Sequence, residues 1–219
     1  KFAGGRDKYI TQLYERIQNA EDIEAITSDM KHYNYFYEAY SAVLSGYVGY
    51  NEDGEYGVLV RSPFAAGYYY SHYDDFGVSR TYGYKRRHLG HDMMGSVGTP
   101  IMAVEGGKIE ALGWNQYGGW RVGIRSNDGK RYYYYAHLRK DKPFAEGLKE
   151  GDTVKAGQLI GYLGMTGYSS KENVNNINTP HLHFGIQLIF DESQKDGVNQ
   201  IWIDCYQIIC FLEKYRAKI

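Results

Sequence analysis

From about residue 54 onward the chain consists of short apolar runs separated by turns, and this pattern restricts the fold to one built mainly of β-strands. Polar residues with glycine punctuate the runs, as in Glu105-Gly-Gly, Asn127-Asp-Gly and Glu150-Gly-Asp. The runs are 56–60, 97–104, 120–124, 132–136 and 182–188. We therefore expect a mainly β body with an antiparallel β-sheet or β-sandwich core.

Helical periodicity replaces the strand pattern at both ends of the chain. Ile10, Leu13, Tyr14 and Ile17 recur at the spacing of one helix face, which predicts one or two helices over residues 8–46. A C-terminal helix is predicted over residues 202–218, packed on the sheet. Because 219 residues suit one substantial core with an appended segment, we expect a helical N-terminal segment, residues 1–60, and one main domain, residues 61–219.

Charge and hydropathy exclude two classes of partner. The formal net charge is -1, and no block of basic residues is present beyond Lys85, Arg86 and Arg87, so nucleic-acid binding is not expected. No run of 18 apolar residues occurs, so no membrane span is expected in this chain. The chain begins at Lys1 rather than methionine, which suggests that an upstream signal or anchor was removed or is left out of this sequence.

Cysteine and tyrosine usage points to packing. Cys205 and Cys210 do not make a disulfide framework, and on a helix they would lie about 140° apart, so two packed thiols are expected. The 24 tyrosines suit strand packing first, with stacking on sugars or peptide docking as alternatives.

Histidines and one aspartate form the most informative motifs. His181 and His183 flank Leu182, and alternation along a strand points both imidazoles the same way while Leu182 turns into the core. Far upstream, His88 and Asp92 lie four residues apart and share a face in either a strand or a helix. Together they supply a nitrogen and oxygen ligand set of the kind that holds a catalytic zinc ion.

The surroundings of these residues refine the prediction. Gly90 and Pro100 disfavour a helix near His88, so a strand or a strand-to-loop corner is expected. His91 is adjacent to Asp92, would face away in a strand, and is excluded from the ligand set. His32 and His72 are interpreted as surface or packing residues. By the same alternation, His137 is expected to share a face with Tyr133 and Tyr135 and to have aromatic neighbours.

Several short motifs, in order, cover residues from about Ser71 to Phe190. They are Phe76-Gly with Arg80 four residues on, His88-x-Gly-x-Asp92, Gly98-Thr-Pro followed by Ala103, Gly107-Lys-Ile, Tyr135-Ala-His137-Leu, Gly151-Asp-x-Val-Lys-Ala-Gly-Gln-x-Ile-Gly161, Gly164-x-Thr-Gly167 and Pro180-His-Leu-His-Phe184. In this order and spacing the chain resembles the lysostaphin-type, LytM-like zinc metallopeptidases that cut bacterial peptidoglycan. The resemblance implies a core of the duplicated hybrid motif type.

The resemblance also implies roles for individual residues. Zinc (Zn2+) would be held by His88, Asp92 and His183, with a fourth position left for water, and that arrangement is independently the one expected of a catalytic zinc site. His137 and His181 would be the general base and the stabiliser of the tetrahedral intermediate, in an order that the sequence leaves open.

Three further residues have weaker assignments. Tyr82 is a hypothetical donor to the oxyanion, with a structural tyrosine as the alternative. Arg80 and Arg87 could bind substrate carboxylates, although structural or solvent-facing roles are favoured.

The function implied is that of a zinc endopeptidase, secreted or anchored at the bacterial cell surface, that hydrolyses the stem or cross-link peptide of peptidoglycan. The alternative is a non-hydrolytic scaffold or regulator in a sporulation or cell-division assembly, although the intact ligand set departs from scaffolds that have lost theirs. The tyrosine-rich segment 67–73 resembles the lead-in of sporulation-associated relatives. The polar segment 173–179 is expected at the rim of the site, and the helical N-terminal segment is a hypothetical inhibitory element.

Overall fold

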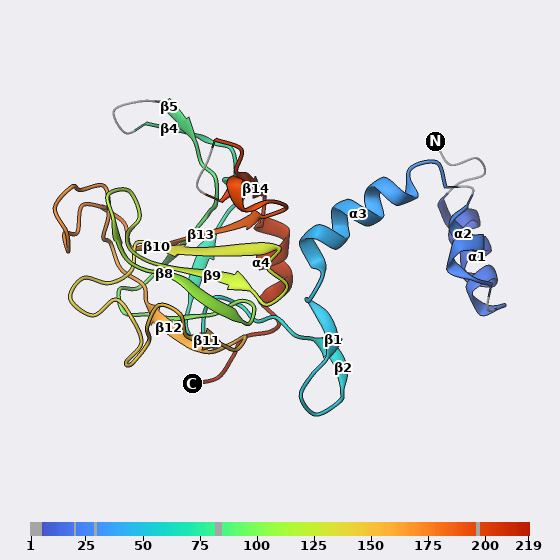
Figure 1. Cartoon of the computed structure of the whole chain (residues 1–219), viewed down its shortest axis with the longest axis horizontal. Helices are drawn as coiled ribbons and strands as arrows, with labels where there is room; N and C mark the ends of the chain where they lie inside the picture. Colours follow the sequence, from blue (N-terminus) through green and yellow to red (C-terminus); the bar gives the residue numbers. More distant parts are fainter. Residues whose placement is uncertain (1–5, 20, 29, 82–84, 196–197) are drawn as a thin grey trace. The chain divides into compact units, whose positions relative to one another are not determined.

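The computed structural model describes residues 6–19, 21–28, 30–81, 85–195 and 198–219 (Figure 1). Contacts between residues divide the chain into two compact units, Lys1–Val43 and Leu44–Ile219. The boundary near residue 60, which the sequence pattern suggested, stays a prediction about domain organisation. Among the described residues, no helix is both long and apolar enough to cross a membrane.

The N-terminal unit is helical, as predicted. It contains α1 (Arg6–Gln18), α2 (Ile23–Thr27) and most of α3 (Tyr33–Leu44). Asp22 caps α2 by accepting a hydrogen bond from the backbone N–H of Glu24, and the Arg16 side chain ties α1 to α2 by donating to the carbonyl of Ala25 over 2.7 Å. Ile10, Tyr14 and Ile17, which gave the periodic pattern in α1, are all exposed.

The second unit is organised around one large antiparallel sheet. Its strands follow the order β11-β8-β9-β10-β13-β6-β3. β6 pairs with residues 181–184 of β13, and β14 pairs with residues 186–188 of the same strand. The bounds are β3 Tyr70–His72, β6 His91–Gly95, β8 Gly107–Asn115, β9 Gly119–Ser126, β10 Arg131–Ala136, β11 Thr153–Val154, β13 His181–Leu188 and β14 Ile201–Ile203. Every strand pair among the described residues is antiparallel, so the predicted mainly β fold is confirmed.

Smaller strand pairs lie beside this sheet. They are β1 (Val48–Tyr50) with β2 (Tyr56–Val58), β4 (Ser79–Thr81) with β5 (Lys85–Arg87), and β7 (Pro100–Met102) with β12 (Leu159–Tyr162). A short 3-10 helix, η1 (Glu192–Gln194), follows β13.

The core covers one face of the sheet. Tyr135 is paired with Phe184 and Tyr133 with Ile186, and all of these side chains are buried. Ile209 and Leu212 of α4 (Tyr206–Leu212) belong to the same buried cluster, so the C-terminal helix covers the sheet as expected.

The helix at the C-terminus is shorter than the sequence predicted. Residues 201–203 form β14, which pairs with β13 through Ile203 and Ile186, and the helix occupies only Tyr206–Leu212. The first apolar residues of the helix predicted over 202–218 pair with β13 instead, because that half of β13 has no other partner on this side among the described residues. After α4, the backbone carbonyls of Tyr215 and Ala217 accept from the backbone N–H groups of Ser62 and Ala66, so the chain bonds to another segment there rather than continuing the helix. Cys205 is buried beside the start of α4, and both cysteines are free thiols.

Candidate metal centre

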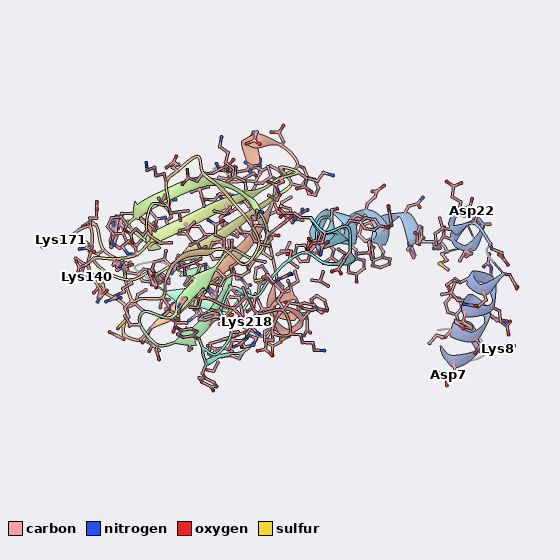
Figure 2. All side chains as sticks on the ribbon, turned by 90° about the horizontal axis from the view of Figure 1, so that it is seen from below. Asp7, Lys8, Asp22, Lys140, Lys171 and Lys218 are labelled. Carbon is pink, nitrogen blue, oxygen red and sulfur yellow. The ribbon has the colours of Figure 1, made fainter. Side chains whose placement is uncertain are left out.

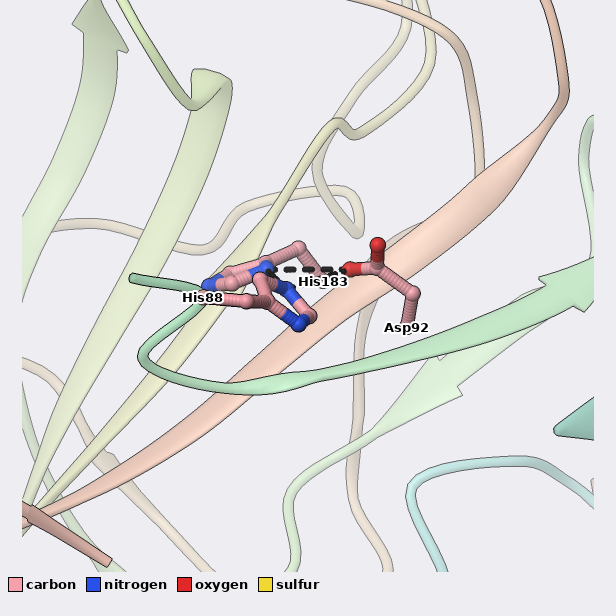
Figure 3. A group of neighbouring side chains, drawn as sticks. All are labelled: His88, Asp92 and His183. Atoms are coloured by element: carbon pink, nitrogen blue, oxygen red, sulfur yellow. Dashed lines mark hydrogen bonds and ion pairs between the residues drawn. The ribbon is translucent and has the colours of Figure 1, made fainter. Parts of the chain in front are cut away.

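Two neighbouring strands and one corner bring the predicted ligands together. His183 in β13 is the cross-strand partner of Asp92 in β6, so both side chains lie on the same face of the sheet. His88 follows the last residue of β5 at the corner that leads into β6. Figure 3 shows the three side chains converging from these segments.

The distances fit a small metal ion. His88 Nε2 lies 2.9 Å from His183 Nδ1 and 3.1 Å from Asp92 Oδ1, while His183 Nδ1 lies 3.0 Å from the same oxygen. Ligands around a tetrahedral zinc ion are about 3.3 Å apart, given bonds of about 2.0–2.1 Å. A donor set of two imidazole nitrogens and one carboxylate oxygen is also one that zinc prefers. The residues present therefore fit zinc in both chemistry and spacing.

Gly90 makes room for the His183 ring. A Cβ atom at residue 90 would lie 2.5 Å from His183 Cε1, 2.6 Å from His183 Nε2 and 2.8 Å from the carbonyl oxygen of Phe184. Any larger residue would push the imidazole away from His88 and Asp92. The glycine in the His88-x-Gly-x-Asp92 motif is thus required by close packing.

Burial and hydrogen bonds together set the pKa values of the three candidate ligands. Burial alone would lower the pKa of His88, but its hydrogen bonds to the carboxylates of Asp75 and Asp92 outweigh burial and raise this pKa to about 9. Burial would raise the pKa of Asp92, but hydrogen bonds to His183 and His88 hold it well below its usual range. Burial dominates at His183 and lowers its pKa. Without metal, His88 is therefore protonated on both ring nitrogens and positively charged at neutral pH.

His137 reaches the site because its backbone departs from the strand. Regular alternation would place it with Tyr135 on the core face, and that prediction is wrong. β10 ends at Ala136, the partner of His183, and His137 has φ 64, a left-handed conformation that turns its ring toward the His183 face. The centroid of its ring lies 5.8 Å from that of His183, and its neighbour among the tyrosines is Tyr168, at 5.7 Å.

The two catalytic candidates present equivalent nitrogens. His137 Nδ1 donates to the carbonyl of Thr166 over 2.8 Å, and His181 Nδ1 donates to the carbonyl of Thr179 over 2.8 Å. In a neutral imidazole whose Nδ1 is the donor, Nε2 is the acceptor. His181 Nε2 lies 3.8 Å from Asp92 Oδ1. Burial lowers the pKa of His137 well below its ordinary value, so this ring is neutral.

Asp75 is the residue that the sequence reasoning missed. It is fully buried, its Oδ2 lies 3.1 Å from His88 Nδ1, and its Oδ1 lies 3.0 Å from His91 Nδ1. The only signal in the sequence is its position directly before Phe76-Gly, which begins the first of the motifs. Burial would raise the pKa of Asp75, but the hydrogen bonds to His88 and His91 prevail and lower it.

The remaining candidates have varied placements. His91 is buried beside His72 and away from the three-ligand cluster, as alternation predicted, and His32 is exposed. Arg80 donates to the carboxylates of Asp75 and Asp92 over 3.0 Å, which is a structural role. Arg87 donates to the carbonyl of Gly77. Tyr82 lies outside the described residues.

The polar loop predicted at the rim is tied to the loop after His137. Asn173 Nδ2 donates to Asp141 Oδ1 over 2.7 Å, and Asn173 Oδ1 accepts from the indole of Trp120 over 2.9 Å. Lys140 and Lys171 accordingly lie beside each other in Figure 2. The same loop leads through Thr179 to His181, so it borders the cluster.

The large antiparallel sheet thus presents His183 and Asp92 on one face, His88 reaches them from the adjoining corner, and two more histidines lie beside them. The model of "Peptidase family M23" matches residues 86–199, and the chain belongs to that family. The resemblance to lysostaphin-type, LytM-like peptidoglycan endopeptidases is thereby confirmed.

Named relatives agree with this family. The L-Ala–D-Glu endopeptidase of Bacillus subtilis is 39% identical over 148 residues, which is 67% of this chain and 42% of that protein. Lysostaphin of Staphylococcus simulans is 44% identical over 98 residues, 44% of this chain and 17% of that protein. The chain thus spans less than half the length of either relative.

A solved structure is similar over the whole chain. It is that of a candidate glycyl-glycine endopeptidase LytM from Ruminococcus gnavus, with a TM-score of 0.65 and 28% identity. The match covers 100% of this chain and 78% of that one.

Proposed function

We propose that this protein is a zinc metalloendopeptidase that hydrolyses a peptide bond in the stem or cross-link of bacterial peptidoglycan. The observation that carries the proposal is the convergence of His88, Asp92 and His183 within hydrogen-bonding distance, with His137 and His181 beside them. Three protein ligands that leave a fourth position for solvent are the arrangement of catalytic rather than structural zinc.

The chain's own residues supply the rest of the chemistry. Bound zinc would lower the pKa of a water molecule toward neutrality and polarise the scissile carbonyl group. Asp92 brings negative charge beside the cation. His137 and His181 share the proton transfer and the stabilisation of the tetrahedral oxyanion, because each offers Nε2 as an acceptor and becomes a donor there once protonated. Tyr82 remains a proposed further donor to the oxyanion.

The first substrate to test is the L-Ala–D-Glu bond of the stem peptide. The relative that covers 67% of this chain is named for that bond. Because peptidoglycan lies outside the cytoplasm, the proposed enzyme acts there, either secreted or anchored at the cell surface. Partners in sporulation or cell division belong to the alternative proposal of a non-hydrolytic scaffold.

The test is digestion of purified cell walls with zinc-loaded protein, followed by mass spectrometry of the released muropeptides. We expect stoichiometric zinc and a new terminus at one stem or cross-link bond, and we expect His183→Ala to abolish both. A zinc-loaded protein that opens no amide bond, together with a His183→Ala variant that keeps its biological role, would overturn the enzyme in favour of the scaffold.

A further inference from the structure

A chain of hydrogen bonds passes from the candidate metal ligands to the end of the C-terminal helix. Asp75 stands at its centre, and beyond His91 the chain continues with 2.7 Å between His91 Nε2 and His72 Nδ1 and 3.4 Å between His72 Nε2 and Glu213 Oε1. The Asp75 side chain therefore touches the ligand His88 on one side and an extended support on the other.

Both oxygens of the Asp75 carboxylate are surrounded by donors. Oδ2 lies 3.1 Å from His88 Nδ1 and accepts from an Arg80 nitrogen at 3.0 Å, and Oδ1 accepts from His91 Nδ1 at 3.0 Å. The backbone N–H of Asp92 lies 3.4 Å from each oxygen. A carboxylate with both oxygens engaged in this way has one orientation. The Asp75 carboxylate contacts the side chain of one candidate ligand, His88, and the backbone N–H of another, Asp92.

The direction of these hydrogen bonds fixes the His88 tautomer. His88 Nδ1 is hydrogen-bonded to the backbone carbonyl of Asp75 over 3.1 Å, and the carboxylate Oδ2 lies 3.1 Å from the same nitrogen. Both oxygens only accept, so a neutral His88 carries its proton on Nδ1. The lone pair of neutral His88 is then on Nε2, which is the nitrogen that faces His183 and Asp92.

We propose that Asp75 is the positioning residue of the metal site: its buried carboxylate holds His88 with Nε2 turned to the metal and anchors the Asp92 backbone, while His91 keeps that carboxylate in place. The inference rests on the proposed function, since it assumes that His88 and Asp92 bind zinc. Outer partners of this kind typically alter metal affinity about 10- to 100-fold when they are changed.

Asp75→Asn is the decisive variant, because it keeps the size of the side chain but replaces one accepting oxygen with an amide N–H₂. That amide then faces a neighbouring group that is itself a hydrogen-bond donor. Asp74→Asn is the matched control, since it removes one negative charge from the adjacent, exposed residue. The zinc dissociation constant of the full chain is measured by competition with a chelator. We expect this dissociation constant to rise about 10- to 100-fold in Asp75→Asn and less than about threefold in Asp74→Asn.

A second measurement needs no variant. In the zinc-loaded wild-type protein labelled with 15N-histidine, NMR should find the His88 ring proton on Nδ1, far downfield in a hydrogen bond. A proton on Nε2, or zinc affinity in folded Asp75→Asn within threefold of wild type, overturns the positioning role while leaving the enzyme intact. A wild-type protein that binds no zinc overturns the proposed function and this inference together.

Discussion

The imidazole rings of His137 and His181 lie edge to face, with 4.8 Å between their centroids. They come from different segments, one just past β10 and the other at the start of β13. Each is oriented by a bond from Nδ1 to a backbone carbonyl, so neither depends on the metal for its position.

We therefore expect His137→Asn and His181→Asn each to lower kcat for muropeptide hydrolysis by about 10²- to 10⁴-fold, the usual contribution of a general acid or base. Asparagine suits position 137 because it tolerates the left-handed backbone there. Zinc content, measured by atomic absorption, should stay unchanged in both variants. His32→Asn, at an exposed histidine of the N-terminal unit, is the control. Full activity in either site variant would remove that histidine from the mechanism.

Gly90→Ala should damage the metal site through packing alone. The new Cβ would lie 2.5 Å from the His183 ring, and crowding of this kind costs about 1–3 kcal/mol of folding free energy. We expect weaker zinc binding and a lower denaturant midpoint. Gly57→Ala is the matched control, since a Cβ there meets nothing within 4 Å. Equal zinc affinity in the two variants would show that the His183 ring can move without loss.

Zinc uptake should depend on pH through His88. The pKa of this ring without metal is raised to about 9, so below pH 9 the metal must displace a proton from it. Affinity should therefore rise about tenfold per pH unit between pH 6.5 and 8.5 and level off above pH 9. In folding, the same shift contributes stability that is fully present below about pH 6.5 and is lost as the pH rises through 9.

Calorimetry in buffers of different ionisation enthalpy measures this proton directly. Close to one proton should be released for each zinc bound at pH 7.5. Zinc binding without proton release would mean that His88 is already neutral or is not a ligand.

Local rules predicted those parts of the site that depend on strand alternation. His181, Leu182 and His183 alternate as expected because β13 is regular and has a core on one face only. His137 could not be placed in this way, since one left-handed residue reverses the face and no neighbouring residue type signals it. Asp75 joins the site through contacts to His88 and His91, more than twelve residues away in sequence, which no local pattern encodes. The later start of the C-terminal helix likewise reflects the pairing of residues 201–203 with β13.

The sheet should depend for its stability on a buried ion pair remote from the metal site. Arg131 is fully buried and donates to both carboxylate oxygens of Glu105 over 2.9 and 3.0 Å, and the hydroxyl of Tyr133 donates to Glu105 over 2.5 Å. Glu105→Gln removes the negative charge that two nitrogens of the buried guanidinium contact, and it leaves the ion pair between Arg131 and Asp128 in place. Breaking such a pair costs about 3–5 kcal/mol.

Urea unfolding of the metal-free protein measures this cost. Glu52→Gln is the matched control, because the Glu52–Lys155 pair is exposed and its loss should cost no more than about 1 kcal/mol. Zinc affinity should be the same in both variants, since Glu105 contacts Arg131 and Tyr133 and Glu52 contacts Lys155, none of which belongs to the three-ligand cluster. If Glu105→Gln were no less stable than Glu52→Gln, the remaining contacts of Arg131 would suffice to balance its charge, and the sheet would not depend on the Glu105 carboxylate.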